Sequence, residues 1–430
     1  MSKRNVLLIG GGGREHALAW KLSQSQLLEK LYIAPGNGGT GSLAENVPIP
    51  ASDIKGLVQF ARTHKIDFVF VGPDDPLALG IVDAFEAVNI PIFGPSKLAS
   101  QLESSKAFAK DFMMRHSIPT SRYAVFSDFE SAVSYADRQT YPIVIKASGL
   151  ALGKGVIIVK TKDEALETLR RIFVEKVFGD SGNEVVIEEF MEGVEFSVHA
   201  FSDGQTIRIF PASQDHKRAH EGDEGPNTGG MGVVAPVPFV SNELLSRIDR
   251  EIITPTIKGM AEEKIPFVGI LYPGIMVTRE GPKVIEYNVR FGDPEAQAYM
   301  RLLETDLLAI AIACVEGRLK EIDIKWKHMF ACNIVIAANG YPSAYEKGEH
   351  IGNIEEAERI SGVVVFHAGT KIDTSGALVS SGGRVLGVSC LSTSLPEALK
   401  LAYEAVTKIL YSGKRYRSDI GKKALITPKI

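Results

Sequence analysis

The stretch Ile285–Glu295 reads I-E-Y-N-V-R-F-G-D-P-E and decides the fold class of this chain. Its β-branched and aromatic residues predict a strand that runs to Phe291 and stops at Gly-Asp-Pro. Because alternate side chains of a strand share a face, Glu286, Asn288 and Arg290 are expected to project together. Hard oxygens suit Mg²⁺ that bridges nucleotide phosphates, and a neighbouring guanidinium can stabilise charge during phosphoryl transfer. We therefore predict a nucleotide-phosphate site rather than the alternative, a solvent-facing strand with a chance ion pair.

Length and charge limit the class of protein. A chain of 430 residues is too long for one core and suggests about three domains. The net charge of −4 gives no reason to expect nucleic acid or an acidic membrane as partner. Three scattered cysteines favour a reducing compartment, and no segment approaches the ~20 apolar residues of a membrane span. We expect a soluble, cytoplasmic protein.

The pattern of apolar runs divides the chain into three parts. In residues 1–103 short apolar strands alternate with amphipathic helices, which predicts a doubly wound parallel sheet in a Rossmann-like domain. Residues 104–328 form a second domain, with a small α+β module at about 120–192. Residues 329–430 carry short apolar runs and turn pairs, typical of a small, mostly β domain. The predicted fold class is thus α/β and α+β, in several domains.

A glycine-rich hairpin is predicted between strands at Ile143–Lys146 and Val156–Val159. Its loop reads K-A-S-G-L-A-L-G-K-G, in which glycines let backbone amides approach phosphate oxygens and lysines supply charge. The spacing does not match a Walker A loop, and no helix follows the last lysine. The loop indicates a flap over a nucleotide, although an ordinary hairpin with solvated lysines is the alternative. Its candidate nucleotide-binding residues are Lys146, Gly153, Lys154 and Gly155.

Three further segments carry candidate residues. The turn I-E-E-F-M-E-G at 187–193 can offer its backbone to an adenine edge, and Glu195 can take ribose hydroxyls, although an acidic linker would look the same. The polar run 213–232 is expected to be one long functional loop, in which His216 is a weak candidate for a general base. The opening G-G-G-G-R-E-H fails the dinucleotide fingerprint and suits an anion at a helix N-terminus.

Together these features resemble the ATP-grasp fold, and the chain from end to end resembles the phosphoribosylamine–glycine ligase (glycinamide ribonucleotide synthetase) family of purine biosynthesis. The resemblance rests on five stretches: G-G-R-E-H-A-L-A-W at 12–20, A-P-G-N at 34–37, Q-D-H-K-R at 214–218, G-P-N-T-G-G-M-G at 225–232 and V-R-F-G-D-P-E at 289–295. It implies ATP-dependent ligation of glycine to 5-phosphoribosylamine through glycyl phosphate. It also implies ATP as cosubstrate, Mg²⁺ or Mn²⁺, and a monomer or weak dimer.

The resemblance assigns roles to particular residues. It implies that Arg290, Asp215 and Lys217 are catalytic residues. It also implies that Glu286 and Asn288 are the metal ligands. ATP would contact Lys106, Lys146, Gly153, Lys154, Gly155, Glu188, Glu189, Phe190 and Glu195. The other substrates would contact Gly12, Gly13, Arg14, Glu15, Asn37, Gly38, Gly39, Asp74, Asp215, Arg290, Gly292 and Asp293.

The chain departs from the expected family pattern at three places. Ser148 stands where an aspartate is expected, and Asp74 where a glutamate is expected. The partner strand at Ile270–Val277 lacks a carboxylate, so phosphates and water are expected to complete the metal shell. Other activities stay open: a different ATP-grasp ligase, a carboxylase that uses bicarbonate, a nucleotide-binding oxidoreductase, or an inactive nucleotide sensor.

Overall fold

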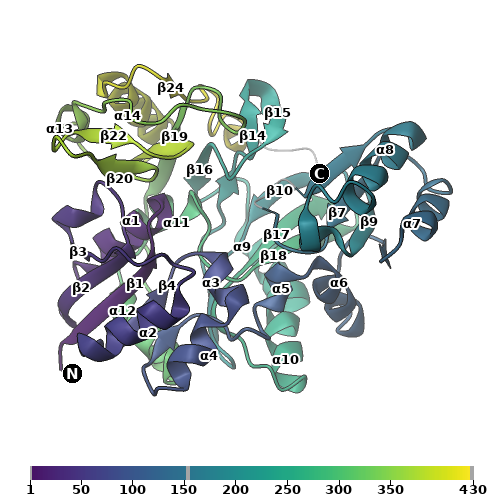
Figure 1. Ribbon diagram of the computed structural model, residues 1–430, viewed down its shortest axis with the longest axis horizontal. Helices are drawn as coiled ribbons and strands as arrows, with labels where there is room; N and C mark the ends of the chain where they lie inside the picture. Colours follow the sequence, from purple (N-terminus) through teal and green to yellow (C-terminus); the bar gives the residue numbers. More distant parts are fainter. Residues whose placement is uncertain (1, 152–154, 427–430) are drawn as a thin grey trace.

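The computed structural model describes residues 2–151 and 155–426, and its first part is a parallel sheet. The strands run in the order β3-β2-β1-β4-β5, and every pair is parallel (Figure 1). Its central strands are buried because helices cover both faces, as the sequence predicts. The elements are β1 (Arg4–Gly10), α1 (Gly13–Leu22), β2 (Leu28–Pro35), β3 (Glu45–Asn46), α2 (Ile54–Thr63), β4 (Phe68–Val71), α3 (Asp74–Leu79), α4 (Ile81–Glu86) and β5 (Ile92–Phe93).

Two short helices lead to a small module that projects at one side of the molecule (Figure 1). The module is an antiparallel sheet in the order β6-β9-β7-β8 with a hydrophobic cluster of its own beneath two helices. A separate core allows this module to move as a unit. Its elements and the two leading helices are α5 (Gln101–Ser104), α6 (Lys106–Arg115), β6 (Tyr123–Phe126), α7 (Phe129–Ala136), β7 (Ile143–Ala147), β8 (Val156–Val159), α8 (Lys162–Phe173) and β9 (Val185–Glu189).

The central sheet is built on β17, which pairs with β10 and β11 along one edge and with β18 along the other. The predicted strand at Ile285–Phe291 is too long, because β18 ends at Asn288. The register of this pair shifts between Gly274 and Ile275 of β17, where Ile285 is the extra residue on β18. The elements are β10 (Val194–Ser197), β11 (Ala200–Asp203), β12 (Ile207–Ile209), α9 (Asn242–Ile248), α10 (Thr254–Glu262), β17 (Val268–Thr278), β18 (Gly281–Asn288), α11 (Glu295–Leu302) and α12 (Leu307–Val315).

The last sheet has the order β13-β16-β19-β23-β20, with β24 on β19. Two of its strands come from residues 214–235, so the run 213–232 is not one long loop as predicted. It contains β13 and then a hairpin, β14–β15, whose strands pair with each other. The elements are β13 (Gln214–Asp215), β14 (Arg218–His220), β15 (Glu224–Asn227), β16 (Gly232–Ala235), β19 (Phe330–Ala338), α13 (Ile354–Glu358), β20 (Val363–His367), β21 (Thr370–Ile372), β22 (Leu378–Ser380), β23 (Arg384–Ser392), α14 (Leu395–Lys408) and β24 (Lys414–Arg415).

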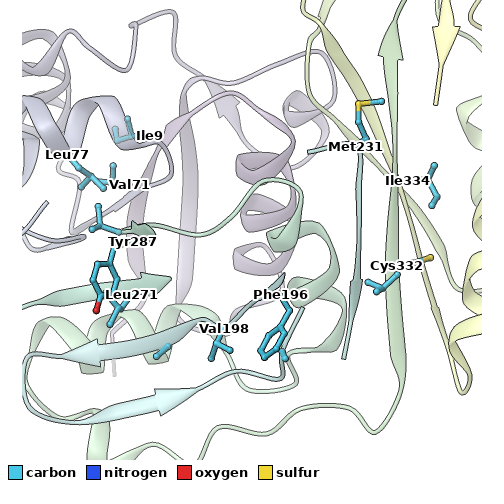
Figure 2. Close-up of a cluster of buried hydrophobic side chains, with 14 of the residues drawn as sticks. Ile9, Val71, Leu77, Phe196, Val198, Met231, Leu271, Tyr287, Cys332 and Ile334 are labelled. Carbon is cyan, nitrogen blue, oxygen red and sulfur yellow. The ribbon is translucent and has the colours of Figure 1, made fainter. Parts of the chain in front are cut away.

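One hydrophobic cluster runs through three of the four larger sheets described above. Figure 2 labels members of it from the N-terminal sheet, such as Val71, from the central sheet, such as Leu271, and from the C-terminal sheet, such as Ile334. The shared core fixes these three parts against one another, and the side chains that line the space between them are held accordingly. No helix of the described residues is both long and apolar enough to cross a membrane.

Buried neutral histidines make stability depend on pH. Burial lowers the pKa of His16 and His216 to about 3 and that of His367 to about 4. As the pH falls below the ordinary value of 6.5, the unfolded chain binds protons that the folded chain does not. The free energy of unfolding should therefore fall by about 2 kcal/mol per histidine at pH 5.

Thermal unfolding at pH 7.5 and pH 5 checks this expectation, because most carboxylates keep their charge over that interval. The His16→Asn variant offers an oxygen near the position of Nδ1, which accepts the backbone N–H of His367. It should lose part of the pH dependence. Equal midpoints for the wild type at both pH values would contradict the interpretation.

Candidate functional site

A cavity of about 710 Å³ lies where the N-terminal part, the projecting module, the central sheet and the C-terminal sheet meet. Glu286 and Asn288 reach it from β18, and Arg290 reaches it from just beyond that strand. The Arg290 Nη2 donates a hydrogen bond of 3.0 Å to the Asn288 Oδ1. The structure thus brings the three residues together as predicted, although only two of them lie on the strand.

Two carboxylates surround the Arg290 guanidinium, whose side chain is 16% exposed. The Nη2 donates to the Glu103 Oε1 at 2.6 Å, and the other Glu103 oxygen accepts the Val289 N–H at 2.8 Å. Burial would lower the pKa of Arg290, but Glu103 and Asp74 hold it above its usual value. The Nε is buried and has no hydrogen-bond partner among residues 2–151 and 155–426.

Lysines line the side of the cavity next to the projecting module. The Lys146 Nζ lies 2.9 Å from the Glu188 Oε1 and donates to the Ile285 carbonyl at 3.0 Å. The other Glu188 oxygen lies 3.1 Å from the Lys110 Nζ. Burial lowers the pKa of Lys106, whose Nζ donates to the Gly149 carbonyl at 3.2 Å. This wall is positively charged and incompletely paired, which suits a polyphosphate.

The carboxylate of Glu195 contacts a lysine. Its Oε1 lies 2.9 Å from the Lys217 Nζ, which is 3.8 Å from the Glu286 Oε1. Burial would raise the pKa of Glu286, but Lys217 and Lys146 keep it below its usual value, so Glu286 is ionised at neutral pH. The predicted contact of Glu195 with ribose stays a prediction.

Two acidic groups face each other behind Lys217. Burial and the neighbouring Glu295 raise the pKa of Asp215 well above its usual range. The Glu295 Oε1 accepts a hydrogen bond of 2.6 Å from the Tyr272 hydroxyl. An ammonium group between Asp215 and Glu295 would relieve the repulsion that raises this pKa.

The N-terminal part contributes Arg14 and Asp74 to the opposite end of the cavity. Asp74 is the first residue of α3. Burial would raise the pKa of Asp74, but Arg290 and Arg14 hold it below its usual value. The Arg14 Nη1 donates to the Phe291 carbonyl at 3.1 Å, which ties α1 to the segment after β18.

Several predicted substrate residues lie behind the cavity wall. Glu15 is buried, and its two oxygens accept the Gly12 N–H at 2.6 Å and the Arg14 Nε–H at 2.6 Å. Gly12 and Gly13 stand at the start of α1. The Asn37 amide donates to the Gly11 and His367 carbonyls, and the loop of Gly38 and Gly39 packs on the C-terminal part. In this structure Glu15 positions Arg14, and Asn37 holds its own loop.

Some of the remaining predicted residues line the cavity, and others hold neighbouring segments in place. The Asp293 Oδ2 lies 2.8 Å from the Arg384 Nη2, and Gly292 donates its N–H to the His199 Nε2 at 3.2 Å. Gly155, Glu189 and Phe190 line the cavity, and the Glu189 carboxylate pairs with Arg122. Gly153 and Lys154 lie outside the described residues. Ser148 accepts the Ala107 N–H at 3.1 Å and so supports the start of α6.

The chain was compared with protein families and solved structures. Models of the N, ATP-grasp and C domains of phosphoribosylglycinamide synthetase match residues 4–103, 104–296 and 331–423. The chain belongs to the phosphoribosylglycinamide synthetase family. This result confirms the family and the ATP-grasp fold that the sequence motifs predicted.

Individual relatives agree with the family models. The phosphoribosylamine–glycine ligases of Vibrio vulnificus and Brucella melitensis are 48% and 50% identical to this chain, with 98% of each chain covered. A bifunctional purine biosynthetic protein of Schizosaccharomyces pombe is 51% identical, and the match spans 54% of its length. The solved phosphoribosylamine–glycine ligase of Thermotoga maritima superposes with a TM-score of 0.84 at 32% identity, over 96% of this chain and 99% of that one.

A more distant structure shares the fold alone. The biotin carboxylase domain of Hydrogenobacter thermophilus 2-oxoglutarate carboxylase superposes with a TM-score of 0.73 at 15% identity, over 97% of this chain and 92% of that one. That protein was solved with MgADP and bicarbonate bound.

Sequence reasoning missed four residues of this phosphoribosylglycinamide synthetase site. Glu103 and Lys110 lie on helices before the projecting module, Glu295 begins α11, and Arg384 begins β23. Glu103, Lys110 and Arg384 contact predicted residues from distant parts of the chain, so their spacing in the sequence carries no signal. Glu295 contacts Tyr272 and stands at the end of the stretch Ile285–Glu295. The sequence carried a partial signal for Lys110, because it stands four residues after Lys106 and residues at i and i+4 share a helix face.

The Glu103→Gln variant tests the support of Arg290. A neutral amide keeps an acceptor for the Val289 N–H but removes the charge opposite the buried guanidinium, so turnover should fall by about tenfold or more. Steady-state turnover with circular dichroism of the folded variant measures this. Glu86→Gln, an exposed change on α4, is the control, and equal turnover in both variants would contradict the role of Glu103.

Proposed function

We propose that this chain joins glycine to 5-phosphoribosylamine with hydrolysis of ATP to ADP, giving glycinamide ribonucleotide and phosphate. The observation that carries the proposal is one cavity that places Arg290 between a lysine-lined wall and a polar end formed by Arg14 and Asp74. Such a cavity can hold a polyphosphate, a carboxylate and a sugar amine in one row. Family membership and the names of the relatives support the choice of substrates.

The residues of the lysine wall fit ATP and Mg²⁺. The Lys106 ammonium and the Arg290 guanidinium line the cavity and suit phosphate oxygens. The ionised carboxylate of Glu286 and the Asn288 Oδ1 form a hard-oxygen pair. Among residues 2–151 and 155–426 there is no cluster of three or more acidic, His or Cys side chains that could hold the ion. Phosphates and water would therefore complete its shell. Bound there, Mg²⁺ would neutralise charge on the phosphates.

Glycine fits between the acidic pair and Arg290. Asp215 and Glu295 would hold its ammonium, and Arg290 would direct its carboxylate toward the γ-phosphate, with Lys217 close by. A carboxylate oxygen attacks the γ-phosphorus, the bond to the β–γ bridging oxygen breaks, and glycyl phosphate and ADP form. Arg290 stabilises the charge that develops on the transferred group.

Phosphoribosylamine fits at the end of the cavity with Arg14 and Asp74. Its amine attacks the acyl carbon of glycyl phosphate, phosphate leaves with the oxygen that came from glycine, and the nitrogen loses a proton. Closure of the projecting module would exclude water from the intermediate. Location in the cytoplasm, action as a monomer or weak dimer, and use of Mn²⁺ in place of Mg²⁺ remain predictions from the sequence.

The Asp74→Asn variant tests the placement of phosphoribosylamine. Loss of one charge-assisted hydrogen bond should raise the KM for the ribosylamine by about tenfold, and should change the KM for glycine much less. Initial rates over a matrix of the two substrates give both constants. Asp75→Asn, an exposed neighbour on the same helix, should behave as the wild type. A larger effect on glycine than on the ribosylamine would refute the placement.

Product formation tests the proposed function itself. Purified protein with ATP and Mg²⁺ receives glycine alone, phosphoribosylamine generated in place alone, or both. ADP should appear in step with glycinamide ribonucleotide only when both are present. ADP formation that follows bicarbonate and a different acceptor instead would keep the fold and overturn the substrates.

A further inference from the structure

His216 stands between two candidate catalytic residues but points away from them. Asp215 and Lys217 line the cavity, whereas the His216 imidazole is fully buried on the other side of the chain. Its Nδ1 lies 3.2 Å from the Gly232 carbonyl, and its Nε2 lies 3.0 Å from the Gly421 N–H. Since a carbonyl only accepts and an N–H only donates, the imidazole is neutral, with its proton on Nδ1. A ring whose two nitrogens are both engaged this way is no general base.

Gly421, whose N–H the His216 Nε2 accepts, belongs to residues 416–425, which we call the C-terminal clasp. The clasp follows β24 and is fixed to α14, because the Tyr403 hydroxyl donates to the Arg417 carbonyl at 2.9 Å and accepts the Ile420 N–H at 3.0 Å. Ile420 and Ala424 are buried in the main hydrophobic cluster. The clasp is thus a rigid part of the C-terminal sheet region.

A second set of bonds joins the clasp to the β14–β15 hairpin. The Arg417 Nη1 donates to the Asp223 Oδ1 and to the Arg218 carbonyl, both at 3.0 Å. The Lys423 Nζ lies 2.9 Å from the other Asp223 oxygen, and the Asp419 Oδ2 accepts the Gly222 N–H at 2.9 Å. Arg417 is only 2% exposed. Asp223 and Lys423 are partly exposed, but the buried Arg417 guanidinium is costly to leave unpaired. Its bonds to Asp223 and to the Arg218 carbonyl therefore favour one geometry.

The two attachments enclose the segment that carries Asp215 and Lys217. His216 fixes its middle, Arg417 fixes the hairpin that follows, and β13 fixes its start against β16. We propose that the C-terminal clasp positions Asp215 and Lys217 for the reaction, with His216 and Arg417 as positioning residues. The proposal rests on the proposed function for its kinetic consequences. It makes a remote segment, which reaches the cavity only through Lys423, a determinant of turnover.

The position of the clasp predicts that its loss lowers kcat more than it changes the KM for ATP. The residues proposed to hold ATP, such as Lys146 and Glu286, lie on β7 and β18, which the clasp does not touch through His216 or Arg417. Loss of the clasp should therefore displace Asp215 and Lys217 most, and should affect the ATP residues less, through the contacts of Lys217 with Glu195 and Glu286. A displacement of about 1 Å at a reacting centre costs on the order of 100-fold in rate.

Five variants test the proposal, each measured by steady-state kinetics, hydrogen exchange and the unfolding temperature. His216→Ala and Arg417→Ala should lower kcat by about tenfold or more, with the KM for ATP within about twofold of the wild type. His216→Gln keeps an acceptor for the Gly421 N–H, and Arg417→Lys keeps the charge, so each should recover part of the activity. Arg415→Ala, an exposed arginine bonded to Asn339, is the matched control and should equal the wild type. Hydrogen exchange of residues 214–228 should rise in the two alanine variants only.

The outcomes separate the possible failures. Wild-type kcat and exchange in folded His216→Ala would overturn the proposal. A general loss, with the KM for ATP and the unfolding temperature altered together and no recovery by His216→Gln or Arg417→Lys, would overturn it in favour of a purely structural role. Absence of ligase turnover in the wild type would refute the proposed function. In that case the exchange of residues 214–228 still decides whether the clasp holds this segment.

Discussion

The site is organised around one buried positive charge. Removing a guanidinium from water is costly unless acidic groups and hydrogen-bond acceptors surround it. Arg290 meets this demand with Glu103 from α5, Asp74 from α3 and Asn288 from β18. The need to compensate a single charge thus joins the N-terminal part to the end of the central sheet, and the cavity forms at that junction. The guanidinium lines this cavity, where its positive charge suits an anionic ligand.

The same principle extends along the cavity. Several candidate residues or segments are held by a partner from a distant part of the chain: Lys146 by Glu188, Asp293 by Arg384, and the segment around His216 by Gly421. Catalysis by oriented charges requires groups that do not reorganise during the reaction. The three parts that share the main hydrophobic core supply this rigidity, while the projecting module has a core of its own. The fold therefore separates a fixed reaction centre from a part that is free to close over it.

Local sequence patterns predicted the fold and most of the cavity, because strands and glycine turns depend on residues that are close together in the sequence. Glu286, Asn288 and Arg290 were found through the period of a strand, although β18 stops at Asn288 and Arg290 is kept in the group by its bonds to Asn288 and Glu103. Long-range partners such as Glu103 could not be found, since nothing in one sequence reports a contact across 187 residues. The run 213–232 was misread for the same reason: β16 pairs with β19 about a hundred residues later.

The central claim is that Arg290 and its neighbours direct phosphoryl transfer to the carboxylate of glycine. Glycine labelled with ¹⁸O in its carboxylate tests this directly, with unlabelled ATP and phosphoribosylamine, by mass spectrometry of the released phosphate. The account predicts one ¹⁸O atom in each phosphate, carried from glycine through glycyl phosphate. Phosphate without the label, formed in step with ADP and the ribonucleotide, would contradict it.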